Sequence, residues 1–244
     1  MTAYRRIQRT QKNNIKEEKL IVFFRTIKSS QVYLDAKHFV LGNLPFTFYL
    51  ILDVHTRLPL ACVLLQRYEL RTGYDKILNH LKAKNVQIKA IISDGHKGLQ
   101  ASIKDHYPEA IHQRCAAHVL QEAYRKLGGR RFTKTIIARK IWPIMRNIAL
   151  KFDNYFSAKM YLCRMKKKYP TYFKAFKVFD KQLVGIYQFE KNKELNIPRT
   201  SNQIENFMGF LEQRLKTMRG MKTPTNVIKI LCSLIQIKIK KPTN

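Results

Sequence analysis

Residues 88–118 constrain the fold of this chain more than any other part of its sequence. An apolar run typical of a buried strand (88–93) is followed by a helical pattern (97–107) and a second short strand (110–113). Two strands joined by a crossover helix pair in parallel, because the crossover returns the chain to the end of the sheet where it started. The segment therefore predicts a parallel strand pair with a helix packed against it.

Three further strand-like runs precede this unit, at residues 31–40, 46–52 and 58–66. Short turn segments separate them, so we expect an antiparallel meander, followed by a helix over 72–84. The order of elements is then βββ-α-β-α-β, the order of the ribonuclease H-like fold. We predict an α/β protein with a ribonuclease H-like mixed sheet and a helical insertion before the last core helix.

The remaining sequence divides by composition and periodicity. Residues 15–27 carry a helical pattern within a basic start, and two long helical patterns lie at 202–218 and 224–239. The expected segments are a basic N-terminal segment (1–30), the first part of the core (31–118), a helical insertion (119–196), a core helix with an acidic residue (197–222) and a C-terminal helix (223–244).

The charge of the chain is strongly unbalanced. It carries 47 Lys and Arg against 16 Asp and Glu, a formal net charge of +31, while 45% hydrophobic residues suffice for a core. Such a charge predicts a polyanionic partner, and nucleic acid is favoured over a membrane surface because the basic residues are spread along the chain. We expect no membrane span and no signal peptide. Four scattered cysteines indicate reduced thiols and an intracellular location, in the cytoplasm with the nucleoid in a prokaryote or in the nucleus in a eukaryote.

Three acidic residues occupy unusual positions: Asp35 within the first strand, Asp94 at the end of the fourth, and Glu205 at the start of a long helix. In the predicted sheet the first and fourth strands are neighbours, so these carboxylates would converge. Two divalent ions roughly 3.5–4 Å apart, Mg²⁺ or Mn²⁺, would suit such a group and a phosphodiester substrate. Without metal, mutual repulsion should raise the pKa of some of the carboxyl groups.

Each acidic residue also has a simpler interpretation. Asp35 could lie exposed on an edge strand, and Asp94 could serve only the Asp-Gly turn that follows a strand. Glu205 could complete a capping box with Asn202, and Glu212, on the same helix, competes with it as third carboxylate.

The chain resembles the Mutator-like group of DDE transposases in an extended pattern of eight positions. These are Asp94, Gly98, Leu99, Pro108, Ala110, Gln113, Cys115 and His118, and Glu205 followed by Asn206 matches the third-carboxylate helix of the family. The resemblance implies a metal-dependent enzyme that cuts at transposon ends and joins the freed 3′-hydroxyl to target DNA. It also implies that Asp35, Asp94 and Glu205 hold the metal ions, with Gly98, Gln113, Cys115, His118 and Asn206 in supporting positions.

Basic residues provide candidates for contacts with DNA phosphates. They are Arg130, Arg131, Lys166, Lys167, Lys168, Arg214, Lys216 and Arg219. A homodimer or higher assembly on DNA is expected, because two transposon ends must be brought together.

The Cys-x-x-His motif and the function of the chain as a whole each have an alternative interpretation. Cys115-x-x-His118 is half of a zinc spacing, but zinc sites usually have four ligands, which favours a buried Cys and a supporting His. For the whole chain, a non-catalytic DNA-binding derivative and another ribonuclease H-like nuclease are the competing functions. The presence of all three carboxylates favours the transposase.

Overall fold

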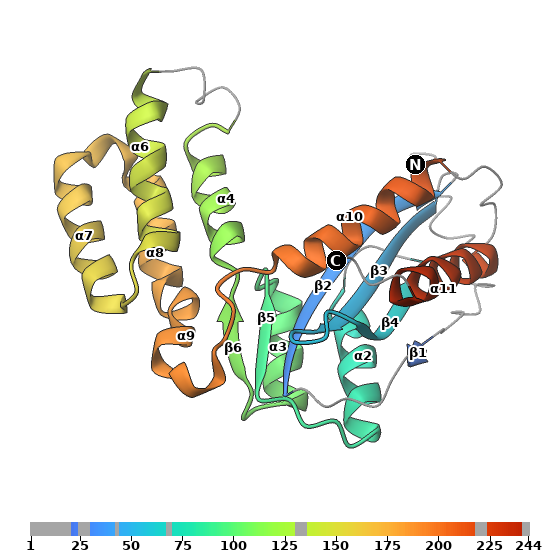
Figure 1. Ribbon diagram of the computed structural model, residues 1–244. Helices are drawn as coiled ribbons and strands as arrows, with labels where there is room; N and C mark the ends of the chain where they lie inside the picture. Colours follow the sequence, from blue (N-terminus) through green and yellow to red (C-terminus); the bar gives the residue numbers. More distant parts are fainter. Residues whose placement is uncertain are drawn as a thin grey trace, which may run out of the picture.

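A mixed β-sheet with helices on both faces organises the chain (Figure 1). The computed structural model describes residues 21–23, 30–41, 44–66, 70–129, 136–217 and 224–240. Within these residues the sheet has six strands in the order β1-β4-β3-β2-β5-β6. The strands are β1 (Ile21–Phe23), β2 (Gln31–Leu41), β3 (Leu44–Asp53), β4 (Pro59–Leu65), β5 (Ala90–Ser93) and β6 (Ile111–Arg114).

The sheet changes from antiparallel to parallel at β2. On one side β2 pairs with β3 along its whole length, from Val32 opposite Asp53 to Leu41 opposite Leu44. On the other side it pairs with β5 in parallel over three residues only, ending with Tyr33 opposite Ile92. The central strand therefore continues past the end of its parallel neighbour, and the predicted meander and crossover are both confirmed.

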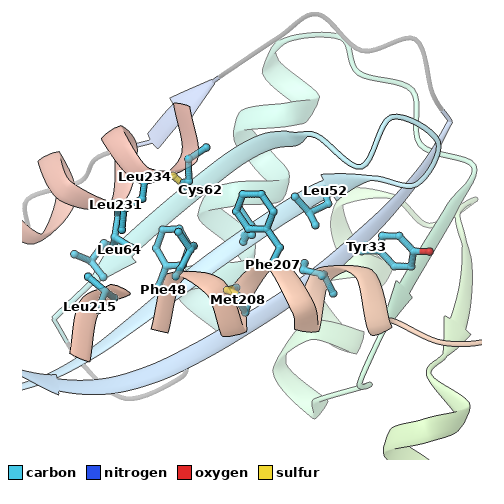
Figure 2. Close-up of a cluster of buried hydrophobic side chains, with 14 of the residues drawn as sticks. Tyr33, Phe48, Leu52, Cys62, Leu64, Phe207, Met208, Leu215, Leu231 and Leu234 are labelled. Atoms are coloured by element: carbon cyan, nitrogen blue, oxygen red, sulfur yellow. The ribbon is translucent and has the colours of Figure 1, made fainter. Parts of the chain in front are cut away.

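Both faces of the sheet are buried, which explains why its strands read as nearly continuous apolar runs. All seven residues of β4 are buried. One face packs against α2 (Arg71–Ala83) and α3 (Lys97–His106). The opposite face packs against α10 (Asn202–Thr217) and α11 (Pro224–Lys240), and Figure 2 shows its apolar side chains, among them Phe48 and Phe207.

The segment between β6 and α10 is helical and has a core of its own. Its helices are α4 (Ala116–Lys126), α6 (Ile136–Arg146), α7 (Tyr155–Lys168), α8 (Phe173–Ile186) and α9 (Gln188–Lys191), with a π-helical turn at Asn147–Lys151 and 3₁₀ turns at Pro170–Tyr172 and Lys193–Leu195. The buried side chains of these helices, such as Phe176 and Phe179, form a cluster separate from those on the two sheet faces. In Figure 1 this helical part lies beyond the β6 edge of the sheet.

The sequence-based elements agree with the structure with one exception. The helix expected over 15–27 is wrong at residues 21–23, which form β1 and pair with β4 from Ile21 opposite Val63 to Phe23 opposite Ala61. An open backbone edge on β4 and β-branched or aromatic side chains favour a strand there. The other residues of that predicted helix lie outside the described part of the chain. None of the described helices is long and apolar enough to cross a membrane.

Gln113 joins the sheet to the helical part. Its side chain, fully buried in β6, donates from Nε2 to the carbonyl of Ile186 at 2.9 Å and accepts at Oε1 from the backbone N–H of Phe189 at 2.9 Å. One amide thus satisfies two backbone groups at the end of α8 and the start of α9.

We predict that Gln113→Met lowers the free energy of unfolding by about 2–4 kcal/mol, because it leaves the buried carbonyl of Ile186 and the partly buried N–H of Phe189 without partners. Chemical denaturation measures the loss. Gln121→Met, at an exposed position of α4, is the matched control and should change stability by less than about 0.5 kcal/mol. Equal losses in the two variants would contradict the bridging role.

Candidate active site

Strand register brings Asp35 and Asp94 to the same level of the sheet. Tyr33 and Ile92 are paired across β2 and β5, and each aspartate lies two residues further along its strand direction. Because side chains alternate between faces, both aspartates share the face of Tyr33 and Ile92, which is the face covered by α10. Neighbouring strands lie about 4.8 Å apart, so the two carboxylates are close neighbours.

A tight turn directs the chain away from the sheet immediately after Asp94. Gly95 has φ +73°, and a Cβ there would overlap the side chain of Arg114. The carbonyl of Gly95 accepts from Arg114 Nη1 at 2.5 Å, and Asp94 Oδ1 accepts from the backbone N–H of His96 at 2.9 Å. The Asp-Gly turn thus exists, and the buried Arg114 holds it in place beside the carboxylate.

Glu205 is held at the start of α10 by the residue that precedes this helix. Ser201 Oγ donates to Glu205 Oε1 at 2.8 Å, and the backbone N–H of Ser201 lies 3.3 Å from the sulfur of Cys115. The helix begins at Asn202, so the alternative interpretation of Glu205 as part of a capping box with Asn202 does not hold, and the Ser201 hydroxyl is the partner of Glu205. Buried Ser201 therefore connects the end of β6 to the acidic residue of α10.

The carboxylates influence one another electrostatically. The pKa of Asp35 is raised to about 7, first by burial and then by the negative charges of Asp94 and Glu205. The backbone N–H of Ala36, which donates to Asp35 Oδ1 at 2.9 Å, and the nearby His118 oppose this shift in pKa. The direction of this shift is the one expected for converging carboxylates, and burial of Asp35 contributes more to it than the neighbouring charges do.

Cys115 and His118 interact directly beside these carboxylates. Interaction with Cys115 raises the pKa of His118 to about 9, against the effect of burial, and Glu205 and Asp35 raise it further. Burial raises the pKa of the Cys115 thiol, but interactions with His118 and Ser201 outweigh it and lower that pKa. His118 Nδ1 lies 3.6 Å from Glu205 Oε1. At neutral pH a positive imidazolium therefore faces the acidic group.

Glu212, the alternative third carboxylate, and the glycines Gly98 and Gly209 make different contacts from the three predicted carboxylates. Glu212 forms an ion pair with Lys37 at 3.0 Å and, with it, lines a cavity of about 240 Å³ between β2, α10 and α11. A Cβ on Gly98 would come within 3.2 Å of the backbone of Arg71, so Gly98 permits close packing of α3 on α2. A Cβ on Gly209, one turn after Glu205, would meet no atom within 4 Å.

The predicted DNA-contacting residues are spread over the structure. Lys166 on α7 is paired with Asp180 at 2.5 Å, while Lys167 and Lys168 are exposed at the end of the same helix. Arg214 is exposed on α10, as is the supporting residue Asn206. The side chain of Lys216 and the residues Arg130, Arg131 and Arg219 lie outside the described part of the chain. These contacts stay predictions.

Two residues of the site were not identified from sequence. Ser201 had a local signal, a serine directly before a helical pattern, which is typical of a helix N-terminus. Arg114 lies between two motif positions, Gln113 and Cys115, but only the structure reveals its contact with Gly95.

We predict that Ser201→Ala weakens Mn²⁺ binding to the apoprotein by about tenfold. Without the hydrogen bond from Ser201, the Glu205 carboxylate is less well oriented to bind a cation. Isothermal titration calorimetry measures the affinity. Ser102→Ala is the matched control, since Ser102 is equally buried and its Oγ donates to Asp75 Oδ1 at 2.7 Å, away from the acidic group. A similar loss of Mn²⁺ affinity in both variants would contradict a specific role for Ser201.

No curated protein matches the chain. Among solved structures, one chain of a cryo-EM complex described as the simian T-cell lymphotropic virus intasome with PP2A regulatory subunit B56 gamma is similar at 12% identity and a TM-score of 0.29. That similarity covers 62% of this chain and 62% of the other, too weak a likeness to support an argument.

The family comparison is decisive. The model described as "Transposase, Mutator family" matches residues 60–238, which is more than half of the chain and includes Asp94, Cys115, His118 and Glu205. The chain therefore belongs to the Mutator family of transposases.

Proposed function

We propose that this chain catalyses metal-dependent DNA strand cleavage and strand transfer, with Asp35, Asp94 and Glu205 as the catalytic carboxylates. One observation carries the proposal: the β2–β5 register places Asp35 and Asp94 on one sheet face, where burial and then the charges of Asp94 and of Glu205, from a distant helix, raise the pKa of Asp35 to about 7. Folding that gathers like charges is unfavourable by itself, and a bound cation or substrate compensates for it.

The architecture supports a ribonuclease H-like core. Three antiparallel strands, β2 to β4, are followed by two parallel strands, β5 and β6, with helices on both faces. We further propose that residues 31–118 and 197–222 form this core and that 119–196 form an insertion between its last two parts. The separate apolar core of the helical segment supports that division.

The donor atoms suit Mg²⁺ or Mn²⁺. Asp35, Asp94 and Glu205 offer carboxylate oxygens, which these hard cations prefer, and two ions would fit a group of this charge. When bound, such ions supply charge stabilisation at the attacking and leaving oxygens of a phosphodiester. The chain itself orients the carboxylates: the β2–β5 register aligns the aspartates, and Ser201 holds the glutamate.

His118 supplies a positive charge beside the carboxylates. Its pKa of about 9 keeps the imidazolium protonated at neutral pH. Placed 3.6 Å from Glu205, it could hydrogen-bond to a non-bridging phosphate oxygen and favour binding of the DNA backbone at this site.

The net charge of +31 supports DNA as the partner, both at transposon ends and at the target. The exposed Lys167, Lys168 and Arg214 are proposed phosphate contacts, together with the other predicted basic residues. An assembly of two or more copies on DNA would allow two ends to be processed together. A protein acting in this way works inside the cell, where DNA is found.

The competing functions are a non-catalytic DNA-binding derivative and another nuclease of the same fold. Retention of all three carboxylates in one electrostatic group argues against the first. The Mutator-family match argues against an unrelated nuclease.

A plasmid-nicking and strand-transfer assay with Mn²⁺ tests the proposed reaction. We expect activity in the parent protein and none above the metal-free level in Asp94→Asn, because this variant removes a charge needed to hold the cation. Asp180→Asn is the control and should retain activity, because Asp180 pairs with Lys166 on the helical insertion. Equal nicking by the parent and Asp94→Asn would exclude the proposed site.

The pKa of Asp35 makes metal binding depend on pH. Below about pH 7 this carboxyl is protonated in the apoprotein, so a cation must displace the proton. We predict that Mn²⁺ affinity rises about tenfold from pH 6 to pH 8, as the carboxyl ionises. Calorimetric titrations at the two pH values measure the change. In Asp35→Asn the affinity should be lower, with a weaker dependence on pH; an unchanged pH dependence would contradict the assignment.

A further inference from the structure

Three different metal-ligand atoms meet at the junction of β6, α4 and α10. The thiol sulfur of Cys115, an imidazole nitrogen of His118 and a carboxylate oxygen of Glu205 all lie within 4.8 Å of one another. Cys115 directly precedes α4 and His118 lies in its first turn, while Glu205 comes from the first turn of α10. Tertiary packing therefore completes the half-site seen in the Cys-x-x-His spacing.

The donor set differs in kind from the aspartate pair beside it. Sulfur and imidazole ligands favour borderline or soft cations such as Zn²⁺, whereas carboxylates alone favour Mg²⁺ and Mn²⁺. Three protein ligands with one open position suffice for zinc in many proteins. The Cys115 thiol thus adds a soft ligand that the proposed catalytic reaction does not use, next to the His118 imidazole and the Glu205 carboxylate.

An unsatisfied nitrogen points to a ligand at this position. Nδ1 of His118 is buried and makes no hydrogen bond within the described part of the chain. It lies 3.6 Å from Glu205 Oε1. Two ligands of one tetrahedral Zn²⁺ ion, each at 2.0–2.1 Å from it, are separated by roughly 3.4 Å. The spacing of the nitrogen and the oxygen therefore suits a shared ion with little movement.

The ligand atoms are also oriented by neighbours, as is typical of metal sites. The backbone N–H of Ser201 approaches the Cys115 sulfur at 3.3 Å, a contact that stabilises a thiolate. The Ser201 hydroxyl donates to Glu205 at 2.8 Å. One residue thus restrains two of the three ligands.

We propose that Cys115, His118 and Glu205 form a site for one thiophilic divalent cation, with Zn²⁺ as its best occupant and a fourth position open. Binding at this site is independent of the proposed function. One consequence rests on that function: an ion that engages Glu205 here withdraws it from the aspartates, so Zn²⁺ inhibits the reaction that Mn²⁺ supports.

The test is a Co²⁺ titration of the metal-free full-length chain, followed by absorption spectroscopy. Co²⁺ replaces Zn²⁺ and reports a thiolate ligand by a sulfur-to-metal charge-transfer band in the near ultraviolet. We expect one equivalent to produce this band and Zn²⁺ to abolish it. Asp94→Asn should retain the band, which separates this site from the proposed catalytic one.

Cys115→Ser should lose the band and bind Zn²⁺ about a hundredfold or more weakly. Cys163→Ser, which alters an exposed cysteine on α7, is the matched control and should keep the charge-transfer band and the Zn²⁺ affinity of the parent. If Cys115→Ser does not fold, His118→Asn replaces it and should give a weaker band at the same Co²⁺ concentration. No band in the parent, or an unchanged band in folded Cys115→Ser, would overturn the site.

The inhibition is tested separately by adding Zn²⁺ to the Mn²⁺-dependent nicking assay. Nicking by the parent should fall steeply once one equivalent of Zn²⁺ is bound. At the same Zn²⁺ concentration, Cys115→Ser should keep a larger fraction of the nicking rate that it shows without Zn²⁺. Equal sensitivity would overturn the coupling to Glu205. If the parent nicks no DNA, the proposed function fails while the cobalt spectrum still decides the metal site.

Discussion

The short parallel pairing of β2 with β5 is the constraint on which the rest of this structure depends. It covers three residues, and just beyond it, where β5 ends and β2 continues, Asp35 and Asp94 lie close enough for the charge of Asp94 to raise the pKa of Asp35. A change of one residue in this register would move one aspartate to the opposite face of the sheet. The apolar residues Val32 and Ile91, buried on one face, and Tyr33 and Ile92, on the other, prevent such a slip.

Glu205 reaches this point through a second set of interactions. The apolar side of α10, including Ile204 and Met208, packs on the sheet face that carries the aspartates (Figure 2). Ser201 then ties the start of the helix to Cys115 and to the Glu205 side chain. Burying Asp35 beside other carboxylates opposes folding, as its raised pKa indicates, so the apolar packing of the sheet and helices must hold the site together.

Much of the architecture could be predicted from the sequence because local patterns encode it. Runs of two-sided apolar residues, the turns between them and the helical period of later segments predicted the order from β2 to β6, a helical insertion without its individual helices, and the helices α10 and α11. Asp35 and Asp94 could be identified because a carboxylate within or directly after an apolar strand is unusual. β1 was missed because its three residues become a strand only when the edge of β4 is beside them.

The sequence alone determined the element order, the basic character of the chain and the residue types available for chemistry, since these depend on local periodicity and composition. Tertiary structure decided which of them meet. Glu205 and Glu212 lie on one helix, but Glu205 lies near Cys115 and His118, whereas Glu212 pairs with Lys37. Contacts between residues far apart in the chain depend on how helices and strands pack. The periodicity of the sequence indicates which face of an element is buried, but not which other element packs against that face.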